Sequence, residues 1–281
     1  MFVGEVVCFV GFGALIENCI TIYQHEFKCE IVYLCTGKTL MDAAERNLQI
    51  IHIDNKLGFI DHIYRLNKNT LVFSIQNKYY FSESMLKKQE LFVINYHPAI
   101  LPDYRGVNPH TWVIFNQEKR AGITWHRVIQ EIDKGPIIYE EQFSIGNDIS
   151  AIQLLDMTRR VAQSSFSKVI QFLNSQSKEM VIQNTIGNYY SLKDIPNKGL
   201  LDPAWDFYKM SAFLRALDYG YMPVFSKPKI LLNNNEYLIT KYRIQNINES
   251  HVVGDSSWYI IKHEEGYILL KLIERLKKYE G

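Results

Sequence analysis

Apolar runs alternate with amphipathic segments along the first hundred residues. Val6 to Val10 is a continuous apolar run, residues 14–23 carry apolar positions at helical spacing, and Glu30 to Cys35 is apolar again. The same alternation predicts four more elements: a strand at 50–53, a helix at 57–66, and strands at 70–73 and 91–96. Apolar strands separated by helices are typical of a parallel sheet covered on both faces, so the pattern predicts a Rossmann-like α/β domain.

A long amphipathic helix is predicted from Ser150 to Asn174. Ser150 and Gln153 have the spacing of a capping box, which marks the start of a helix. The apolar positions that follow lie on one helical stripe: Ile152, Leu155, Ala162, Phe166, Val169, Ile170 and Leu173. We expect this stripe to pack on the sheet as core.

The pattern changes near residue 186. A helix containing Phe213 to Leu217 is followed by β-rich chain with two predicted hairpins, at 230–240 and 258–270. The sequence therefore predicts a small, mostly β accessory domain at 186–281, after an α/β domain at 1–185.

Composition and charge narrow the class of protein. The 281 residues are 47% hydrophobic, which suffices for one large and one small domain. With 31 basic and 30 acidic residues the net charge is +1, so no overall charge attracts nucleic acid or an anionic membrane. The apolar N-terminus lacks a basic leader, and we expect no signal peptide, no membrane span and a cytoplasmic protein. The four cysteines show no Cys-x-x-Cys pair and the histidines are scattered, so we expect free thiols and no metal.

One short segment concentrates chemically capable side chains at the end of a predicted strand. Asn95 and His97 are two residues apart, so in a strand both leave the same face. Pro98 ends the strand and leaves the amide and the imidazole at the rim of the sheet. Asp133, in a turn shaped by Gly135, can complete an Asn, His, Asp constellation.

A glycine turn follows the first predicted strand. Gly11 and Gly13 suggest a dinucleotide fingerprint, but Ile16 replaces its third glycine and no acidic residue ends the second strand. We therefore interpret Gly11 and Gly13 as a tight turn whose exposed amides can hold an anion, such as a substrate phosphate.

The whole stretch resembles the formyltransferase family that takes its one-carbon unit from 10-formyltetrahydrofolate. The family order is an Asn-x-His-Pro segment, a Tyr-Arg-Gly-like turn, a Gly-(Ile/Val)-Thr strand and an Asp-x-Gly-x-Ile loop. In this chain the motifs stand at Asn95–Pro102, Tyr104–Gly106, Gly122–Thr124 and Asp133–Ile137. The resemblance is strongest over residues 70–145. It implies a Rossmann-like formyltransferase domain, often followed by an accessory domain that differs with the acceptor.

The resemblance also implies binding residues. Two loops are expected to hold the folate, through Ser74, Ile75, Asn77, Tyr79, Glu131 and Ile132. The acceptor is expected near Gly11, Gly13, Arg105, Gly106 and Asn108, with further candidates at His110, Trp112, Trp125 and His126. Core positions are the more ordinary use of the two tryptophans.

The expected reaction is attack of an amine on the formyl carbon, after which the attacking nitrogen loses a proton and tetrahydrofolate departs with the bond to its nitrogen broken. Asn95 is placed to donate to the negative oxygen, His97 to accept the amine proton or to clamp that oxygen, and Asp133 to orient the imidazole. The motif identifies the acceptor only as a primary amine on a small molecule: an amino sugar nucleotide, an amino acid or a carrier-bound amino acid. Two alternatives stay open, a methionyl-tRNA formyltransferase and a hydrolase that releases formate from 10-formyltetrahydrofolate.

Overall fold

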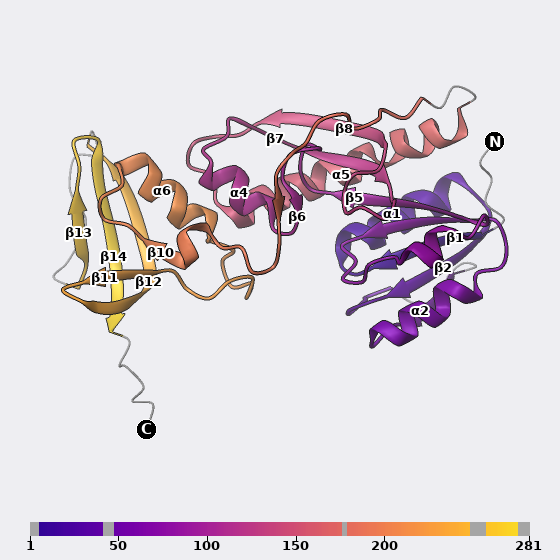
Figure 1. The fold of residues 1–281 in the computed structure, drawn as a ribbon, viewed down its shortest axis with the longest axis horizontal. Helices are drawn as coiled ribbons and strands as arrows, with labels where there is room; N and C mark the ends of the chain where they lie inside the picture. The colour runs from indigo at the N-terminus through magenta and orange to yellow at the C-terminus, as the bar shows by residue number, and fades with distance from the viewer. Residues whose placement is uncertain (1–5, 42–47, 176–178, 248–256, 275–281) are drawn as a thin grey trace. The chain divides into compact units, whose positions relative to one another are not determined.

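The computed structural model describes residues 6–41, 48–175, 179–247 and 257–274 (Figure 1). The chain divides into two compact units that are not continuous segments. The first unit comprises residues 1–106, 121–143 and 156–189, and the second comprises 107–120, 144–155 and 190–281. The expected division between residues 185 and 186 stays a prediction.

A seven-stranded sheet organises the first unit, in the order β3-β2-β1-β4-β5-β7-β8. Its strands are β1 (Val6–Gly11), β2 (Glu30–Cys35), β3 (Leu48–His52), β4 (Thr70–Ile75), β5 (Leu91–His97), β7 (Arg120–Arg127) and β8 (Ile137–Ser144). The pairs from β3 across to β5 are parallel, which confirms the Rossmann-like α/β prediction, whereas β7 runs antiparallel to β5. The apolar pattern alone did not indicate this reversal.

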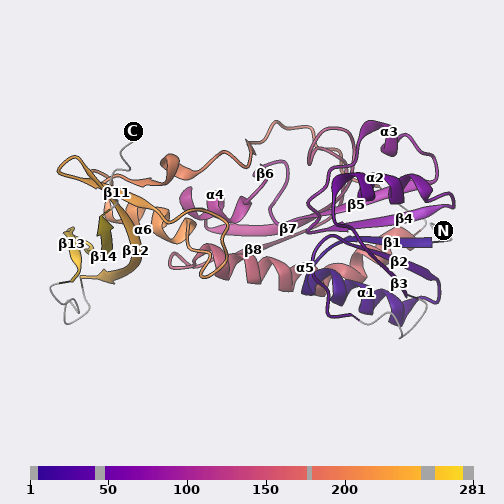
Figure 2. The same ribbon diagram turned by 90° about the horizontal axis from the view of Figure 1, so that it is seen from below.

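Helices cover both faces of this sheet (Figure 2). One face packs against α1 (Ala14–Glu26) and α5 (Ala151–Asn174), and the other against α2 (Lys56–Arg65) and α3 (Glu83–Leu86). Each layer is apolar: Phe9, Phe73 and Phe166 meet on the first face, whereas Val72 and Phe59 lie on the second. Strands buried on both faces read as continuous apolar runs, which is why the pattern located them.

Helix α5 begins and ends as predicted. The backbone N–H of Ser150 donates to Oε1 of Gln153 at 2.8 Å, which is one half of a capping box. The buried row differs at its start, because Leu154 and Thr158 are fully buried while Ile152 and Leu155 are only partly so. The row thus advances by four residues per step before it reaches Ala162, Phe166, Val169, Ile170 and Leu173.

The second unit contains α4 (Pro109–Phe115), α6 (Phe207–Ala216) and a five-stranded sheet in the order β10-β11-β12-β14-β13. The strands are β10 (Leu200–Leu201), β11 (Lys229–Leu232), β12 (Asn235–Asn246), β13 (Tyr259–Lys262) and β14 (Gly266–Glu274). Asn233 and Asn234 both have positive φ, as a two-residue hairpin turn requires. Both predicted hairpins are therefore present, and Phe213, Ile230, Ile268 and Leu270 form their core with α6.

Short elements complete the description. The 3-10 turn η1 spans Pro196–Gly199, and β6 (Arg105–Gly106) pairs with β9 (Tyr189–Tyr190). No helix in the described part of the chain is both long and apolar enough to span a bilayer.

Candidate active site

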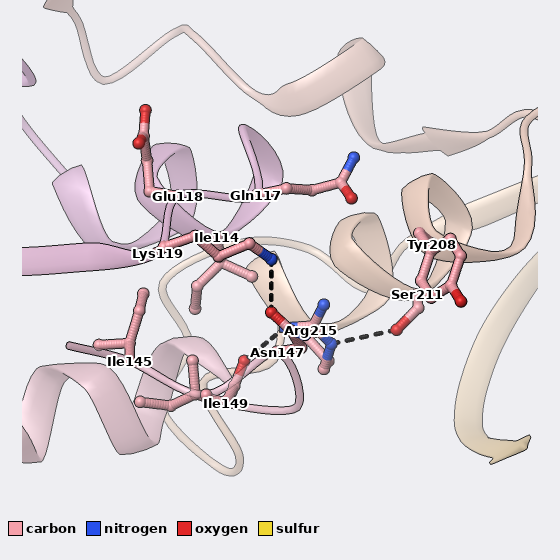
Figure 3. A pocket seen from close by; sticks show the side chains of 11 residues that line it. Ile114, Gln117, Glu118, Lys119, Ile145, Asn147, Ile149, Tyr208, Ser211 and Arg215 are labelled. Carbon is pink, nitrogen blue, oxygen red and sulfur yellow. Dashed lines mark hydrogen bonds between the residues drawn. The ribbon is translucent and has the colours of Figure 1, made fainter.

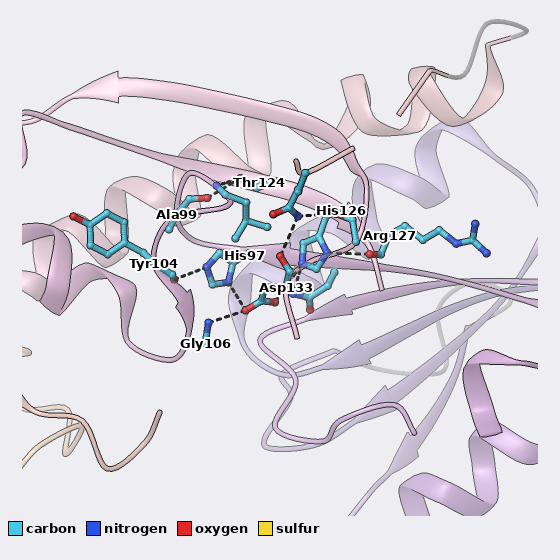
Figure 4. Close-up of polar contacts among 12 residues, drawn as sticks. His97, Ala99, Tyr104, Gly106, Thr124, His126, Arg127 and Asp133 are labelled. Atoms are coloured by element: carbon cyan, nitrogen blue, oxygen red, sulfur yellow. Dashed lines mark hydrogen bonds and ion pairs between the residues drawn. The ribbon is translucent and has the colours of Figure 1, made fainter. Parts of the chain in front are cut away.

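The antiparallel pairing of β5 with β7 builds the floor of the site. In this register Asn95 lies opposite His126, and His97 lies opposite Thr124. Directly paired residues share a face of the sheet, so these four side chains leave it together. Figure 4 shows three of them, His97, Thr124 and His126. Tyr96 and Trp125 pair on the other face and are buried in the core. The alternation along β5 therefore places Asn95 and His97 on one face, as predicted, and Tyr96 in the core on the other.

Thr124 holds the loop that follows β5. Its hydroxyl donates to the carbonyl of Ala99 at 2.7 Å and accepts the backbone N–H of Leu101 at 3.2 Å. The loop then brings the carbonyl of Tyr104 to 2.9 Å from Nε2 of His97. Because a carbonyl only accepts, the hydrogen of a neutral His97 ring sits on Nε2, and the lone pair is on Nδ1.

Asp133 faces that lone pair. Its Oδ2 lies 3.5 Å from Nδ1 of His97 and accepts the backbone N–H of Gly106 at 2.8 Å. Asp133 has a positive φ of 54°, a conformation that Asp tolerates in tight turns. Gly135 follows in the same turn, where a Cβ would lie 1.7 Å from the carbonyl oxygen of Arg127. The turn thus needs glycine to deliver the carboxylate to β5, and the predicted Asn, His, Asp constellation is brought together.

His126 is a fourth member of this cluster. Its Nδ1 lies 3.0 Å from the carbonyl oxygen of Arg127, and with the ring hydrogen on Nδ1 its Nε2 accepts from Nδ2 of Asn95 at 3.3 Å. The same Nε2 lies 3.4 Å from Oδ1 of Asp133. Sequence reasoning placed His126 only among secondary candidates. Its two-residue spacing from Thr124, on a strand that pairs with β5, is the signal that would have identified it.

The side chains of His97, His126 and Asp133 are nearly closed to solvent. The side chains of His97, His126 and Asp133 are 4%, 2% and 10% exposed. Burial raises the pKa of the Asp133 carboxyl, but the nearby imidazoles of His97 and His126 and the N–H of Gly106 outweigh it, and the pKa falls well below its usual range. Burial lowers the pKa of His97, against the opposing attraction of Asp133. Asp133 is therefore a carboxylate, and its negative charge partly offsets the effect of burial on the pKa of His97.

Gln183 anchors the Asp133 turn from fifty residues away. Its Nε2 donates to the carbonyls of Asp133 at 3.0 Å and Gly135 at 2.7 Å. Because both amide hydrogens are used on one turn, Gln183 fixes where the carboxylate stands relative to His97. No motif or periodicity in the sequence identified this residue.

Replacing Gln183 with Met removes both donors at nearly constant volume. We expect the catalytic rate of the site to fall about 10- to 100-fold, because a carboxylate displaced by a fraction of an ångström no longer meets the imidazole. Steady-state kinetics measure the change, and Gln142→Met, at an exposed position on β8, is the matched control. Unchanged kcat in Gln183→Met would show that the turn holds Asp133 without this anchor.

The residues expected to hold the folate lie in two segments. Ser74 is buried in β4 and pairs with Asn95, whereas Ile75 ends β4 inside the core. Strand β4 thus continues two residues beyond its predicted end. The side chain of Asn77 accepts from the N–H of Tyr79 and donates to its carbonyl, which closes the turn after β4. Beside Asp133, the predicted contacts Glu131 and Ile132 are exposed.

The residues expected near the acceptor play several local roles. Gly11 lets β1 approach the Ile75 carbonyl, and Gly13, at φ 89°, is the N-cap of α1. Arg105 is buried and donates to the carbonyl of Gly187, so its guanidinium holds backbone. Gly106 contributes its N–H to Asp133, as described above. Asn108 belongs to the second unit, where it precedes α4 with φ 53°.

Other candidate chemistry stays outside the cluster. Cys8, Cys19 and Cys35 are buried free thiols, and Cys29 is partly buried. Within the described ranges, no group of three or more His, Cys, Asp or Glu side chains is arranged to hold a metal ion.

Comparison with known proteins finds similarity over part of the chain. Residues 78–170 match the model of the formyl transferase family. The chain is 30% identical over 146 residues to a GDP-perosamine N-formyltransferase of Brucella melitensis, covering 52% of this chain and 54% of the relative. The bifunctional polymyxin resistance protein ArnA of Wigglesworthia glossinidia brevipalpis is 29% identical over 173 residues, which are 61% of this chain and 26% of that protein. The alignments therefore span about half or less of these curated relatives.

Solved structures share the fold over nearly the whole chain. WlaRD, a sugar 3N-formyl transferase crystallised in the presence of dTDP and 5-N-formyl-THF, superposes with a TM-score of 0.72 at 23% identity, covering 96% of this chain and 98% of that one. An N-formyltransferase from Helicobacter canadensis, in complex with folinic acid and dTDP-3-aminofucose, gives 0.73 at 21% identity, with 95% and 99% covered. At this identity the likeness establishes the fold.

Proposed function

We propose that this chain, whose residues 78–170 match the formyl transferase family model, transfers the formyl group of 10-formyltetrahydrofolate to a primary amine of a nucleotide-linked amino sugar. The observation that carries the proposal is the cluster of Asn95, His97 and Asp133 at the carboxyl end of β5. The acceptor class is supported by the GDP-perosamine N-formyltransferase relative and by the dTDP-3-aminofucose bound to the Helicobacter canadensis enzyme.

The site has a free hydrogen-bond donor, on Asn95, that suits the formyl group of the donor substrate. 10-Formyltetrahydrofolate supplies the formyl carbon when it is bound. Asn95 is partly exposed and gives one amide hydrogen to His126, so Nδ2 keeps a second that no described residue accepts. We assign this hydrogen to the formyl oxygen, where negative charge develops during attack. Ser74, Asn77, Tyr79, Glu131 and Ile132 are the proposed contacts of the folate itself.

His97 is the proposed proton acceptor for the amine. Its neutral ring presents the Nδ1 lone pair toward Asp133 and keeps the Nε2 hydrogen on the carbonyl of Tyr104. A proton that arrives at Nδ1 is stabilised at once, because the imidazolium then faces a carboxylate on one side and a carbonyl on the other. The site is thus arranged to take up one positive charge. Because burial lowers the pKa of His97, we assign it the role of a base that is charged only after proton uptake, and not that of a permanently charged clamp.

The pH dependence follows from this assignment. Burial lowers the pKa of His97 below its ordinary value near 6.5, so the neutral acceptor form persists into mildly acidic solution. We expect kcat/KM to be flat above about pH 6.5 and to fall as pH drops through the lowered pKa of His97. Since Asp133 raises that pKa, the Asp133→Asn variant should shift the titration of the His97 ring to still lower pH, as measured by NMR. An upward shift would contradict the assignment.

The acceptor is identified by measuring which amine is formylated, and how the rate changes with salt concentration. Purified protein is supplied with 10-formyltetrahydrofolate and with dTDP- and GDP-linked amino sugars, amino acids or methionyl-tRNA, and formylated products are measured. Formylation of a sugar nucleotide, with little change from 50 to 200 mM salt, is the expected outcome. A rate on methionyl-tRNA that falls steeply over this range would favour the tRNA enzyme, because tRNA binding releases counterions. Formate without a formylated amine would favour the hydrolase.

A further inference from the structure

The second unit contains a cavity of about 400 Å³ that none of the residues discussed above as catalytic lines. Its walls come from the end of α4, the turn into β7, the loop between β8 and α5, and one side of α6 (Figure 3). The floor is apolar, formed by Ile114, Ile145 and Ile149, all of which are buried. The volume is within the range of small-molecule sites.

A buried arginine lines this cavity without a carboxylate partner. Arg215 is only 9% exposed, and its guanidinium donates from Nε to the Ser211 hydroxyl at 3.1 Å and from Nη1 to the Ile149 carbonyl at 2.8 Å. Both acceptors are neutral. Among the residues that the structure describes, no carboxylate oxygen lies within 4.0 Å of this guanidinium. A buried charge that is hydrogen-bonded but not neutralised is costly, and an anion in the cavity would remove that cost.

The acidic groups nearest to Arg215 are engaged elsewhere or lie in solvent. Asp148 is exposed, and it attracts the Arg215 guanidinium electrostatically without forming an ion pair with it. Asp218, three residues further along, accepts from the hydroxyl of Tyr242 at 2.7 Å and from the N–H of Gly220 at 2.9 Å. Arg215 therefore keeps guanidinium hydrogens that the Ser211 and Ile149 bonds do not use, next to open volume.

A second cation lies on the same cavity. Lys119 is exposed at the turn into β7, and its ammonium donates to the side-chain oxygen of Asn147. Figure 3 shows Lys119 and Arg215 approaching the cavity from different elements. Glu118 is the one acidic residue in the lining, so the wall carries a net positive charge. Tyr208, 56% exposed on α6, adds an aromatic ring.

We propose that this cavity is a binding site for a small organic phosphate, with the phosphate held between Arg215 and Lys119 and the organic body on the isoleucine floor. Two cations from different elements suit a dianionic phosphate, and the planar guanidinium can offer paired donors to its oxygens. The apolar floor and Tyr208 select a ligand with a compact ring over a bare ion. The site is independent of the formyl transfer proposed above.

Phenyl phosphate is the probe, because it combines the two features in one molecule. Isothermal titration of the full chain at constant ionic strength should give one equivalent bound, more tightly than inorganic phosphate or benzoate. Lys119→Gln should weaken binding at least about tenfold, as expected for loss of a charge-assisted hydrogen bond. Lys87→Gln removes the same charge from an exposed helical position in the first unit and should leave binding unchanged. Arg215→Gln, checked for folding by circular dichroism, should weaken binding further.

A local readout separates this cavity from any phosphate site near Gly13. Acetylation of Lys119 by a water-soluble reagent, followed by peptide mass spectrometry, should be slowed by phenyl phosphate while acetylation of Lys87 is not. Equal affinities in Lys119→Gln and Lys87→Gln, absence of binding up to about 10 mM phenyl phosphate, or no protection of Lys119 would each overturn the proposal. None of these outcomes depends on formyltransferase activity.

Discussion

Replacing His97 with Asn should lower kcat/KM for formyl transfer about 10²- to 10⁴-fold, the range of a lost general base. The variant removes the Nδ1 lone pair that faces Asp133. His126 cannot replace it, because the nitrogen of His126 that faces Asp133 is also bonded to Asn95. Folate binding should be largely retained, because the proposed folate contacts lie on other segments. Stopped-flow kinetics and equilibrium binding of a folate analogue measure the two effects separately.

Asp133→Ala should have an effect of similar size, since it leaves His97 without the charge that stabilises its cation. The double variant should then be little worse than either single variant, because the two residues act as one unit. His25→Asn, at an exposed position on α1, is the matched control for the histidine change. Near-normal turnover in both His97→Asn and Asp133→Ala would remove the basis for the proposed mechanism.

Asn95→Ala should lower kcat about 10²- to 10³-fold with little change in KM. The amide is assigned to the oxygen that becomes negative during attack, so its loss falls on the transition state and not on ground-state binding. Rates at saturating donor and acceptor give kcat directly, and Asn67→Ala is an exposed control. A rise in KM at constant kcat would show that Asn95 binds substrate uniformly and would refute the oxyanion role.

Much of the fold was predictable because its core is built from local signals. Parallel strands buried on both faces are continuous apolar runs, and the capping box at Ser150 marks a helix that begins at Ala151 as expected. The end of β4 was misplaced by two residues, because the polar Ser74 interrupts the apolar run although the strand continues to Ile75. The antiparallel direction of β7 was not accessible either, since strand direction depends on tertiary pairing.

The candidate site divides in the same way. Asn95 and His97 are identified by the two-residue period of a strand, and Asp133 by its turn residues. His126 joins them only through the register of β5 with β7, which sets Asn95 opposite it. Gln183 is fifty residues from the turn that it anchors, and a lone glutamine carries no signal in a single sequence. Arg105 is buried against backbone, although its sequence context is that of an exposed turn.

The most direct test of the account is transfer of an isotopically labelled formyl group from 10-formyltetrahydrofolate to an amino sugar nucleotide, followed by mass spectrometry. The intact protein and His97→Asn are assayed side by side with dTDP- and GDP-linked amino sugars. The account predicts a labelled N-formyl sugar from the intact protein and a rate reduced at least about 10²-fold in the variant. The account would be contradicted if both proteins formed the labelled product at the same rate, or if neither protein consumed the donor.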